Sequence, residues 1–395
     1  MKKKVAIIGA GISGLIFANL LKQDSKYDFT IYEKNSSLKL NEGYGVQLSV
    51  NSVFILNKIG FKNFKIGNKY NPKKIDFYSL KDNNKICELD LTQFNSEDIC
   101  YTTLKRFLLI EFLKEKLLTN SIQFSKKIEK INYSSSKVEI IFKDSSSDVF
   151  DYLVISDGLF SSTKSILFNK NITPKYFGSL SIRGILKKKD SKFFNKNNVS
   201  IFIGHNSHLV AYPVSIENEL NLIAIIRKKL NQNDLYDRGF FEDKNNIKKF
   251  VKKSSIQSNN YLKNIFNSMQ DLKCFPLFTS DKIRQFNKRN TFFLGDALFA
   301  LPPTLAQGAS QSIESAYELF KLLNEDDNDS FNKYYINRTK RIKMINRKSK
   351  LNYFIFHLSN PTLVLLRNII LKIVTNNEKF LNKYLGQIYL KNNFQ

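Results

Sequence analysis

A glycine-rich turn near the start of the chain constrains its fold more than any other feature. The apolar run Val5–Ile8 leads into Gly9-Ala-Gly11-Ile-Ser-Gly14, and a second apolar run, Leu15–Leu21, follows. A strand, a tight turn and a helix with this spacing suit a dinucleotide pyrophosphate. The first glycine permits the turn, the second lets the backbone approach the phosphates, and the third lets the helix lie close to the strand. The free N–H groups at the helix N-terminus then face the anion.

A second predicted strand strengthens this interpretation. Phe29-Thr-Ile-Tyr32 predicts a strand that ends at Glu33, ~20 residues beyond Gly14, where an acidic residue binds a ribose hydroxyl in such folds. A glycine-rich turn of an unrelated α/β domain is the alternative, and the combination of strand, helix and acid disfavours it. By itself the turn fits NAD as well as FAD.

The composition is that of a globular protein of two or three domains, with 395 residues of which 42% are hydrophobic. A net charge of +27 is typical of proteins that bind nucleic acid or anionic membranes. The lysines, however, are spread along the whole chain among Asn, Ile and Ser, so we expect solvated faces and no nucleic-acid partner. Three distant cysteines predict reduced thiols and a cytoplasmic protein. The sequence contains no run of 18 apolar residues, so we expect no transmembrane helix.

Periodicity predicts the elements of the first half of the chain. Asn51 stands where an N-cap precedes a short helix that ends at Gly60. Alternating residues on either side of residues 81–84 predict a hairpin outside the nucleotide fold. From Thr102 to Leu118 the apolar residues recur at helical spacing, and we expect a helix that opens at Thr102.

The pattern changes in the second half. Between Tyr176 and Ile226 several strands with little helix between them predict an antiparallel sheet that forms a second domain. A polar helical stretch is expected from Glu242 to Met269. Ser310–Leu323 then has the spacing of a helix that returns to the nucleotide domain. The remainder, from Phe331 onward, is basic and helical in pattern, with a break at Asn360-Pro361.

Two further motifs follow predicted strands. They are Val154-Ile-Ser-Asp157-Gly158-Leu-Phe-Ser161 and Leu294-Gly295-Asp296-Ala-Leu-Phe299-Ala-Leu-Pro302-Pro303-Thr-Leu-Ala-Gln307-Gly308. Each alone is typical of a turn or a proline-rich loop. Together with the glycine turn they resemble the class A FAD-dependent monooxygenases, the group of para-hydroxybenzoate, salicylate and 6-hydroxynicotinate hydroxylases, over nearly the full length of the chain.

The resemblance implies roles for both motifs. The first is similar to the family's G-A-D-G-x-x-S-x-V-R, whose Asp lies near the FAD pyrophosphate, with Ser156 in place of Ala and Lys164 in place of Arg. The second is similar to G-D-A-A-H-x-x-P-P-x-x-G-Q-G, whose Asp binds the ribityl chain and whose prolines and Gln-Gly line the isoalloxazine ring. Phe299 replaces its His. The helix after this loop would direct its positive end at the flavin, where negative charge collects on reduction.

Weaker matches complete the set of cofactor contacts. Arg106 stands where the family places an arginine that reaches the cofactor, although a solvent-facing Arg at a helix start is equally compatible with the sequence. Gly43-Tyr-Gly45-Val46 resembles the loop that passes along the flavin ring, so the ring is expected between Gly45 and Pro302. The resemblance assigns FAD binding to Gly9, Gly11, Ser13, Gly14, Glu33, Lys34, Gly45, Val46, Arg106, Asp157, Gly158, Asp296, Pro302, Gln307 and Gly308.

Three residues are candidates for substrate contacts: Gln47, Arg183 and Tyr212. Arg183 suits an anionic substrate, with an Arg on a strand edge as the alternative, and Tyr212 fits a core position equally well. No catalytic nucleophile or acid–base pair stands out, and no metal ligand set is expected. The three histidines support neither a metal site nor a hydrolase triad; two belong to a predicted hairpin and one to the C-terminal region, at His205, His208 and His357.

The resemblance implies an α/β fold: a Rossmann-type FAD-binding domain with an inserted antiparallel β-sheet substrate domain and C-terminal helices. We expect a discontinuous FAD-binding domain at residues 1–72, 100–175 and 283–330. The substrate domain would comprise residues 73–99 and 176–282, and the C-terminal helical region residues 331–395.

The implied function is hydroxylation of a small aromatic or related substrate by FAD, NAD(P)H and O2 through a C4a-hydroperoxyflavin. NAD(P)H would be a transient co-substrate, since no second G-x-G-x-x-G marks a nicotinamide domain. An alternative is a peripheral membrane flavoprotein that acts on a quinone or isoprenoid, because residues 360–374 are apolar with flanking basic residues and residues 360–395 would contact the membrane. A helix docked on the flavin domain is the other explanation of that segment. A non-catalytic basic binding protein with the same fold is the third hypothesis.

Overall fold

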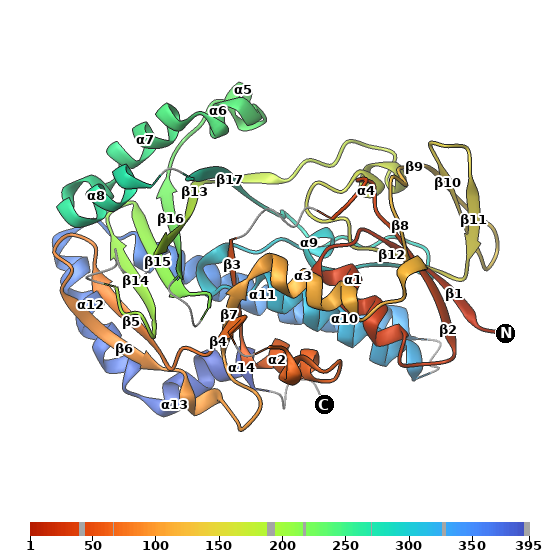
Figure 1. The fold of residues 1–395 in the computed structure, drawn as a ribbon, viewed down its shortest axis with the longest axis horizontal. Helices are drawn as coiled ribbons and strands as arrows, with labels where there is room; N and C mark the ends of the chain where they lie inside the picture. Colours follow the sequence, from red (N-terminus) through yellow and green to blue (C-terminus); the bar gives the residue numbers. More distant parts are fainter. Residues whose placement is uncertain are drawn as a thin grey trace.

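The computed structural model describes residues 1–38, 44–65, 67–187, 194–215, 219–269, 271–325 and 329–390. Figure 1 shows an elongated molecule with the N-terminal strands at one end, a second sheet at the other, and long helices running between them. The expected class is confirmed: a Rossmann-type parallel sheet, a separate and mostly antiparallel sheet, and C-terminal helices.

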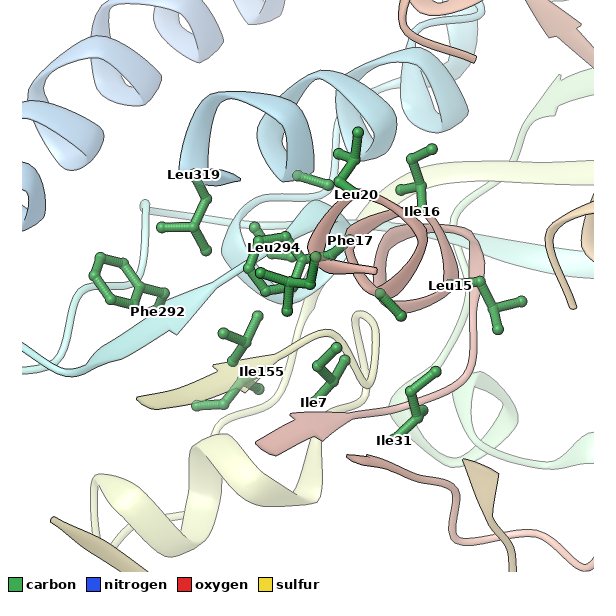
Figure 2. Packing of buried hydrophobic residues seen from close by; sticks show 14 of the residues in the cluster. Ile7, Leu15, Ile16, Phe17, Leu20, Ile31, Ile155, Phe292, Leu294 and Leu319 are labelled. Carbon is green, nitrogen blue, oxygen red and sulfur yellow. The ribbon is translucent and has the colours of Figure 1, made fainter. Parts of the chain in front are cut away.

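The parallel sheet has five strands in the order β18-β12-β1-β2-β8, namely β18 (Thr291–Phe293), β12 (Tyr152–Ile155), β1 (Lys3–Ile8), β2 (Tyr27–Tyr32) and β8 (Ile122–Gln123). Helices α1 (Ile12–Leu21) and α10 (Gly308–Asn324) pack against each other beside this sheet. Figure 2 shows side chains of both helices meeting Ile7 of β1 and Ile155 of β12. Strands this apolar are typical of a parallel sheet covered by helices.

Shorter elements complete this half of the molecule. The helices are α2 (Val50–Asn57), α3 (Arg106–Glu115), α4 (Ser162–Leu167) and α9 (Gly295–Leu298). One antiparallel sheet contains β9 (Ile128–Tyr133), β10 (Val138–Phe142) and β11 (Ser147–Phe150). Another contains β3 (Gly45–Leu48), β7 (Thr102–Lys105) and β4 (Lys69–Tyr70), with β7 in the middle.

The second large sheet has seven strands in the order β17-β13-β16-β15-β14-β5-β6. They are β17 (Lys273–Thr279), β13 (Lys175–Lys187), β16 (Glu219–Arg227), β15 (Ser207–Pro213), β14 (Val199–Gly204), β5 (Lys74–Ser79) and β6 (Lys85–Asp90). The pairing is antiparallel except between β14 and β5, which confirms the predicted hairpin and antiparallel sheet. One face is covered by a helical subdomain of α5 (Gln232–Leu235), α6 (Arg238–Glu242), α7 (Lys244–Lys252) and α8 (Asn260–Ser268).

The C-terminal helices cover the other face of the seven-stranded sheet. They are α11 (Ser330–Phe356), α12 (Pro361–Thr375), α13 (Glu378–Leu381) and α14 (Gln387–Tyr389). A buried ion-pair network ties α11 to α10. Arg338 NH1 donates to Glu314 Oε1 at 2.7 Å, and Arg341 Nε donates to the same oxygen at 2.8 Å. Burial alone would raise the pKa of Glu314. The two guanidinium groups outweigh the effect of burial and hold the pKa of Glu314 below its ordinary value.

Two local predictions are wrong. The helix expected from Thr102 begins at Arg106, because the preceding residues form β7 between β3 and β4, and β-branched Thr102 and Thr103 suit a strand. Asn51 is not an N-cap: it lies inside α2, where its side chain donates to Glu314 Oε2 at 3.0 Å.

The segment after Asn360-Pro361 also departs from the expectation that it docks on the flavin domain. The helix break is confirmed, and Asn360 caps α12 by accepting from the N–H groups of the first turn. The main neighbours of α12 are β6 and α13, so the helix docks on the seven-stranded sheet and not on the nucleotide-binding half. Among the described helices, none combines the length and the apolar character needed to cross a bilayer.

Candidate active site

The glycine turn lies between β1 and α1, at the carboxyl edge of the parallel sheet. Gly9 has a φ of 102°, and a Cβ there would lie 2.8 Å from both Asp157 Cα and the Ser156 carbonyl oxygen. A Cβ on Gly14 would collide with the Gly9 carbonyl and lie 2.7 Å from Ser156 Oγ. Ser156 Oγ donates to the Ile8 carbonyl at 2.8 Å. The fold itself therefore requires the first and third glycines.

Gly11 differs from those two glycines. It precedes α1 with a φ of −84°, and a Cβ there would meet no protein atom within 4 Å. The chain does not need glycine at this position, whereas a pyrophosphate approaching the helix N-terminus does need the space. Glu33 lies beside the turn, where Oε2 accepts from the Ala10 N–H at 3.1 Å. Ser13 is buried and Lys34 is exposed.

Asp157 presents an unsatisfied carboxylate oxygen just after β12. Its Oδ2 accepts from Thr163 Oγ1 at 2.8 Å, whereas the buried Oδ1 has no hydrogen-bond partner among the described residues. Burial raises the pKa of this carboxyl, against the opposing effects of nearby hydroxyls and Lys164. Gly158 follows with a φ of 81° and open space at its Cβ position. An orphaned acceptor beside open space fits a ligand that donates a hydrogen bond.

Asp296 joins this region from a different part of the sequence. Asp296 is exposed, yet desolvation by the surrounding protein raises the pKa of its carboxyl to about 6. Lys164 and Arg106 oppose the shift, which shows that both cations face the carboxyl. Lys164 is itself buried, with Nζ donating to the Leu159 carbonyl at 3.1 Å, and burial lowers its pKa. Three distant stretches therefore share one electrostatic environment.

The proline loop leads from Pro302 into α10. Gln307 is buried and donates from Nε2 to Ser49 Oγ at 2.9 Å, which fixes the loop against β3 and α2. Gly308 is exposed at the start of α10, and a Cβ there would meet no protein atom. The positive end of a 17-residue helix therefore opens onto free space, as an electron-rich group requires.

Gly45 and Val46 lie on β3, opposite Lys105 and Leu104 of β7. A Cβ on Gly45 would lie 2.7 Å from Tyr212 Cε2 and 2.9 Å from Asn221 Cβ. Gly45 N–H donates to Asn221 Oδ1 at 2.7 Å. Glycine is thus required where β3 crosses the seven-stranded sheet, and this requirement is independent of any cofactor. Gly43, quoted with the same loop, lies outside the described residues.

An apolar cavity of about 160 Å³ lies between the seven-stranded sheet, the proline loop and the C-terminal helices. Gln47 and Arg183 line it, together with Pro303 to Ala306 of the proline loop. The structure therefore brings two of the three substrate candidates to one cavity beside the third motif. Tyr212 lies beneath Gly45, outside the residues that line the cavity, and its buried position matches the core alternative.

Sequence reasoning missed a pair of histidines, of which His208 lines this cavity. His208 Nδ1 lies 2.8 Å from His357 Nε2, although 149 positions separate the two residues. Burial lowers the pKa of His208 to about 3, and burial together with His208 lowers that of His357 to about 2, so both rings are neutral near pH 7. Nothing in the spacing of single histidines could have paired them, because their contact depends on how α11 ends over β15.

A wider groove of about 690 Å³ lies between α10 and α11. Its lining is charged and includes Glu318, Lys321, Lys340 and Arg341, and it does not adjoin the proline loop. Neither the glycine turn nor Asp157 contributes to it. Of these two, the smaller cavity is the candidate substrate site, since it meets the third motif and the groove does not.

Comparison with known proteins agrees with this geometry. Residues 2–345 match the model of the FAD binding domain family. The chain is 23% identical over 364 residues to the 3-amino-4-hydroxybenzoate 2-monooxygenase PtnB3 of Streptomyces platensis, covering 90% of this chain and 89% of that protein. It is 21% identical to the 6-hydroxynicotinate 3-monooxygenase of Pseudomonas fluorescens, covering 91% and 93%. The fold is similar to that of Klebsiella pneumoniae HpxO complexed with FAD and uric acid, with a TM-score of 0.83, 18% identity and coverage of 98% and 96%.

Proposed function

Because this chain belongs to the FAD binding domain family and is an FAD-dependent monooxygenase, we propose that it hydroxylates a small aromatic substrate bound in the cavity beside the proline loop. FAD is its cofactor, and NAD(P)H and O2 are the proposed co-substrates. The relatives named above act on ring compounds, an aminohydroxybenzoate and a hydroxynicotinate. Neither of them suggests the quinone or isoprenoid alternative, or a protein without catalytic activity.

The observation that carries the proposal is the position of the cavity. It has about 160 Å³ of space, mostly apolar walls, and the proline loop at one side. A dry cavity of about 150 Å³ accommodates one benzene ring. A substrate with a single ring would therefore lie next to the loop that the resemblance places on the flavin.

The residues at the sheet edge fit FAD. The open Cβ positions at Gly11, Gly158 and Gly308 leave room for the cofactor, and the unpaired Oδ1 of Asp157 offers it an acceptor. We propose contacts to FAD from all fifteen positions that the resemblance assigns, with Gly9, Gly14 and Gly45 acting through the shape of the backbone. When reduced by NAD(P)H, bound FAD supplies the activation of O2. The protein holds the ring in place, excludes water and orients the substrate.

Three of the polar side chains that line the cavity have proposed roles. Arg183 would pair with an anionic substituent, while its Nε donates to Ser181 Oγ at 3.1 Å and its guanidinium lies 5.9 Å from the centre of the Phe275 ring. Gln47 would orient a ring hydroxyl. Its amide is held in place because Oε1 accepts from Tyr101 OH at 2.8 Å. Neutral His208, paired with His357, lines the same cavity and would offer it a ring nitrogen.

The domain boundaries remain part of the proposal. The strands of the parallel sheet all fall in residues 1–72, 100–175 and 283–330, and those of the seven-stranded sheet fall in residues 73–99 and 176–282, apart from Lys175 at the start of β13. This membership supports a discontinuous FAD-binding domain, an inserted substrate domain and a C-terminal region from residue 331. We expect no nucleic-acid partner.

The function is tested by NAD(P)H oxidation across a panel of hydroxybenzoates, hydroxypyridines and neutral phenols, with product and hydrogen peroxide measured together. A substrate must raise the oxidation rate and yield hydroxylated product. Oxidation that yields only peroxide with every compound would contradict the proposal.

A matched pair of variants tests the cavity. Arg183→Met removes a cation from the cavity, and Lys273→Met removes an exposed cation from the position opposite it on β17. For a carboxylate substrate, the first change is expected to raise KM by roughly 10- to 100-fold, because a charged hydrogen bond is lost. The second should leave KM unchanged. Equal effects of the two changes would argue against substrate binding at Arg183.

A further inference from the structure

The outer face of α12 is the largest unexplained surface feature of the molecule. Six aliphatic side chains on this one helix are between 46% and 63% exposed: Leu363, Leu365, Leu366, Ile369, Ile370 and Ile373. The other exposed large hydrophobic residues of the described chain are scattered over many elements. Isolated exposed apolar residues need no explanation, but a continuous apolar face marks a surface that binds something.

Apolar residues lie on both sides of α12. Its inner side faces β6 and the cavity, which it lines with Leu371, Val374 and Thr375. The outer six residues take no part in that packing. Burying the inner face alone would stabilise the fold, so the fold does not account for the aliphatic character of the outer face.

The charge around this face identifies the partner. Residues 331–395 contain thirteen Lys and Arg but a single acidic residue, Glu378. Of these cations, Arg338 and Arg367 are buried and Arg341 is paired with Glu314, so they add nothing to the charge of this face. Close to the apolar face, Lys372 on α12 and Lys379 and Lys383 just beyond it are exposed. An apolar strip with basic residues beside it and almost no acidic residue complements an anionic lipid surface, where the aliphatic side chains enter the acyl boundary and the lysines meet the headgroups. A second positively charged copy of this chain lacks that complementarity.

The length of α12 agrees with an interfacial position. Its 15 residues extend about 22 Å at 1.5 Å per residue, which is too short for a hydrocarbon core of about 30 Å. We propose that the outer face of α12 binds the protein peripherally to anionic membranes, lying in the plane of the interface. This inference goes beyond the proposed hydroxylation and does not depend on it.

Docking in this orientation also places the cavity near the bilayer. Phe380 of α13, the helix that follows α12, lines the cavity and is 40% exposed. The cavity therefore approaches the surface beside the membrane-binding face. The helix that would contact lipid is the same helix that forms one wall of the substrate site.

Flotation of the full-length, FAD-loaded protein tests the proposal. Vesicles of phosphatidylcholine with 30% phosphatidylglycerol are compared with vesicles of pure phosphatidylcholine. The variant Leu366→Lys/Ile370→Lys places two charges in the apolar face at half-exposed positions. The control Leu118→Lys/Val149→Lys adds the same charge at two exposed apolar positions, 71% and 50% exposed, in the nucleotide-binding half.

The wild-type protein and the control are expected to float with the anionic vesicles, and the α12 variant should lose binding by about 100-fold. FAD content and far-ultraviolet circular dichroism should be equal in all three, which excludes unfolding. Failure of the wild type to float, or flotation of the α12 variant like the wild type, would overturn the proposal. So would a concentration-dependent dimer that the α12 variant abolishes while vesicles bind nothing. Flotation without any substrate-stimulated NAD(P)H oxidation would uphold docking and contradict the proposed function instead.

Discussion

Replacing two glycines of the first turn separates what the fold needs from what the cofactor needs. Gly14→Ala introduces a Cβ against the Gly9 carbonyl and 2.7 Å from Ser156 Oγ. The Gly9 carbonyl belongs to the backbone and cannot move aside as a flexible side chain can. We therefore expect a loss of about 3 kcal/mol in the free energy of unfolding, the upper end of the usual cost of overpacking. Gly11→Ala meets no protein atom within 4 Å at an ordinary φ of −84°. Its stability should change by less than about 0.5 kcal/mol, because the reduced freedom of the unfolded chain offsets the poorer N-cap.

The order reverses for FAD affinity. A methyl group at Gly11 occupies the space that the pyrophosphate needs and removes one charge-assisted hydrogen bond, worth about 1.5–3 kcal/mol, which weakens FAD binding roughly 10- to 150-fold. Calorimetric titration of the apoprotein with FAD gives the affinity. Urea unfolding followed by circular dichroism gives the stability, since the chain contains no Trp to serve as a fluorescent probe.

Two results would refute this reasoning. Wild-type FAD affinity in Gly11→Ala would show that no phosphate approaches that position. A loss of apoprotein stability in Gly11→Ala as large as that in Gly14→Ala would show that the turn has a different packing from the one described.

Three further predictions concern the ionisation of single side chains. Glu314→Gln should lower the free energy of unfolding by about 3–5 kcal/mol, because Arg338 and Arg341 lose their buried carboxylate. Urea unfolding measures this loss of stability, and a loss below about 1 kcal/mol would contradict the prediction. In the folded apoprotein the pKa of Asp296 is raised to about 6. The stability contributed by its protonated carboxyl is therefore present below pH 4 and is lost as the pH rises through 6. Relative to wild type, Asp296→Asn should gain stability over that interval, and a difference in unfolding free energy that does not change with pH would refute the pKa shift. The pKa of His208 is lowered to about 3, so the stability contributed by its neutral ring is present above pH 6.5 and is lost as the pH falls. In His208→Gln the unfolding free energy should therefore fall less steeply with pH below 6.5. The same pH dependence as in wild type would count against the buried pair.

The sequence by itself determined the nucleotide-binding half of the protein. Gly9 and Gly14 have no room for any side chain, and such local steric requirements are visible in a motif because they act over a few residues. Hydrophobic periodicity likewise predicted α10 and the hairpin of β5 and β6, and Asn360-Pro361 predicted the break before α12, since each depends on local pattern. Thr102–Lys105 was misassigned because its neighbours in β3 and β4 come from far away in the chain.

Only the tertiary structure decided what surrounds the substrate. The cavity draws its walls from β3, the seven-stranded sheet, the proline loop and the C-terminal helices, and no local pattern encodes a meeting of segments so far apart. The same reason explains the missed pair of His208 and His357, and the position of Tyr212, which packs beside Gly45 and does not line the cavity. For α12 the sequence supplied an apolar helix with basic flanks. Its outward apolar face was settled by packing, because β6 and the cavity take up only the opposite side.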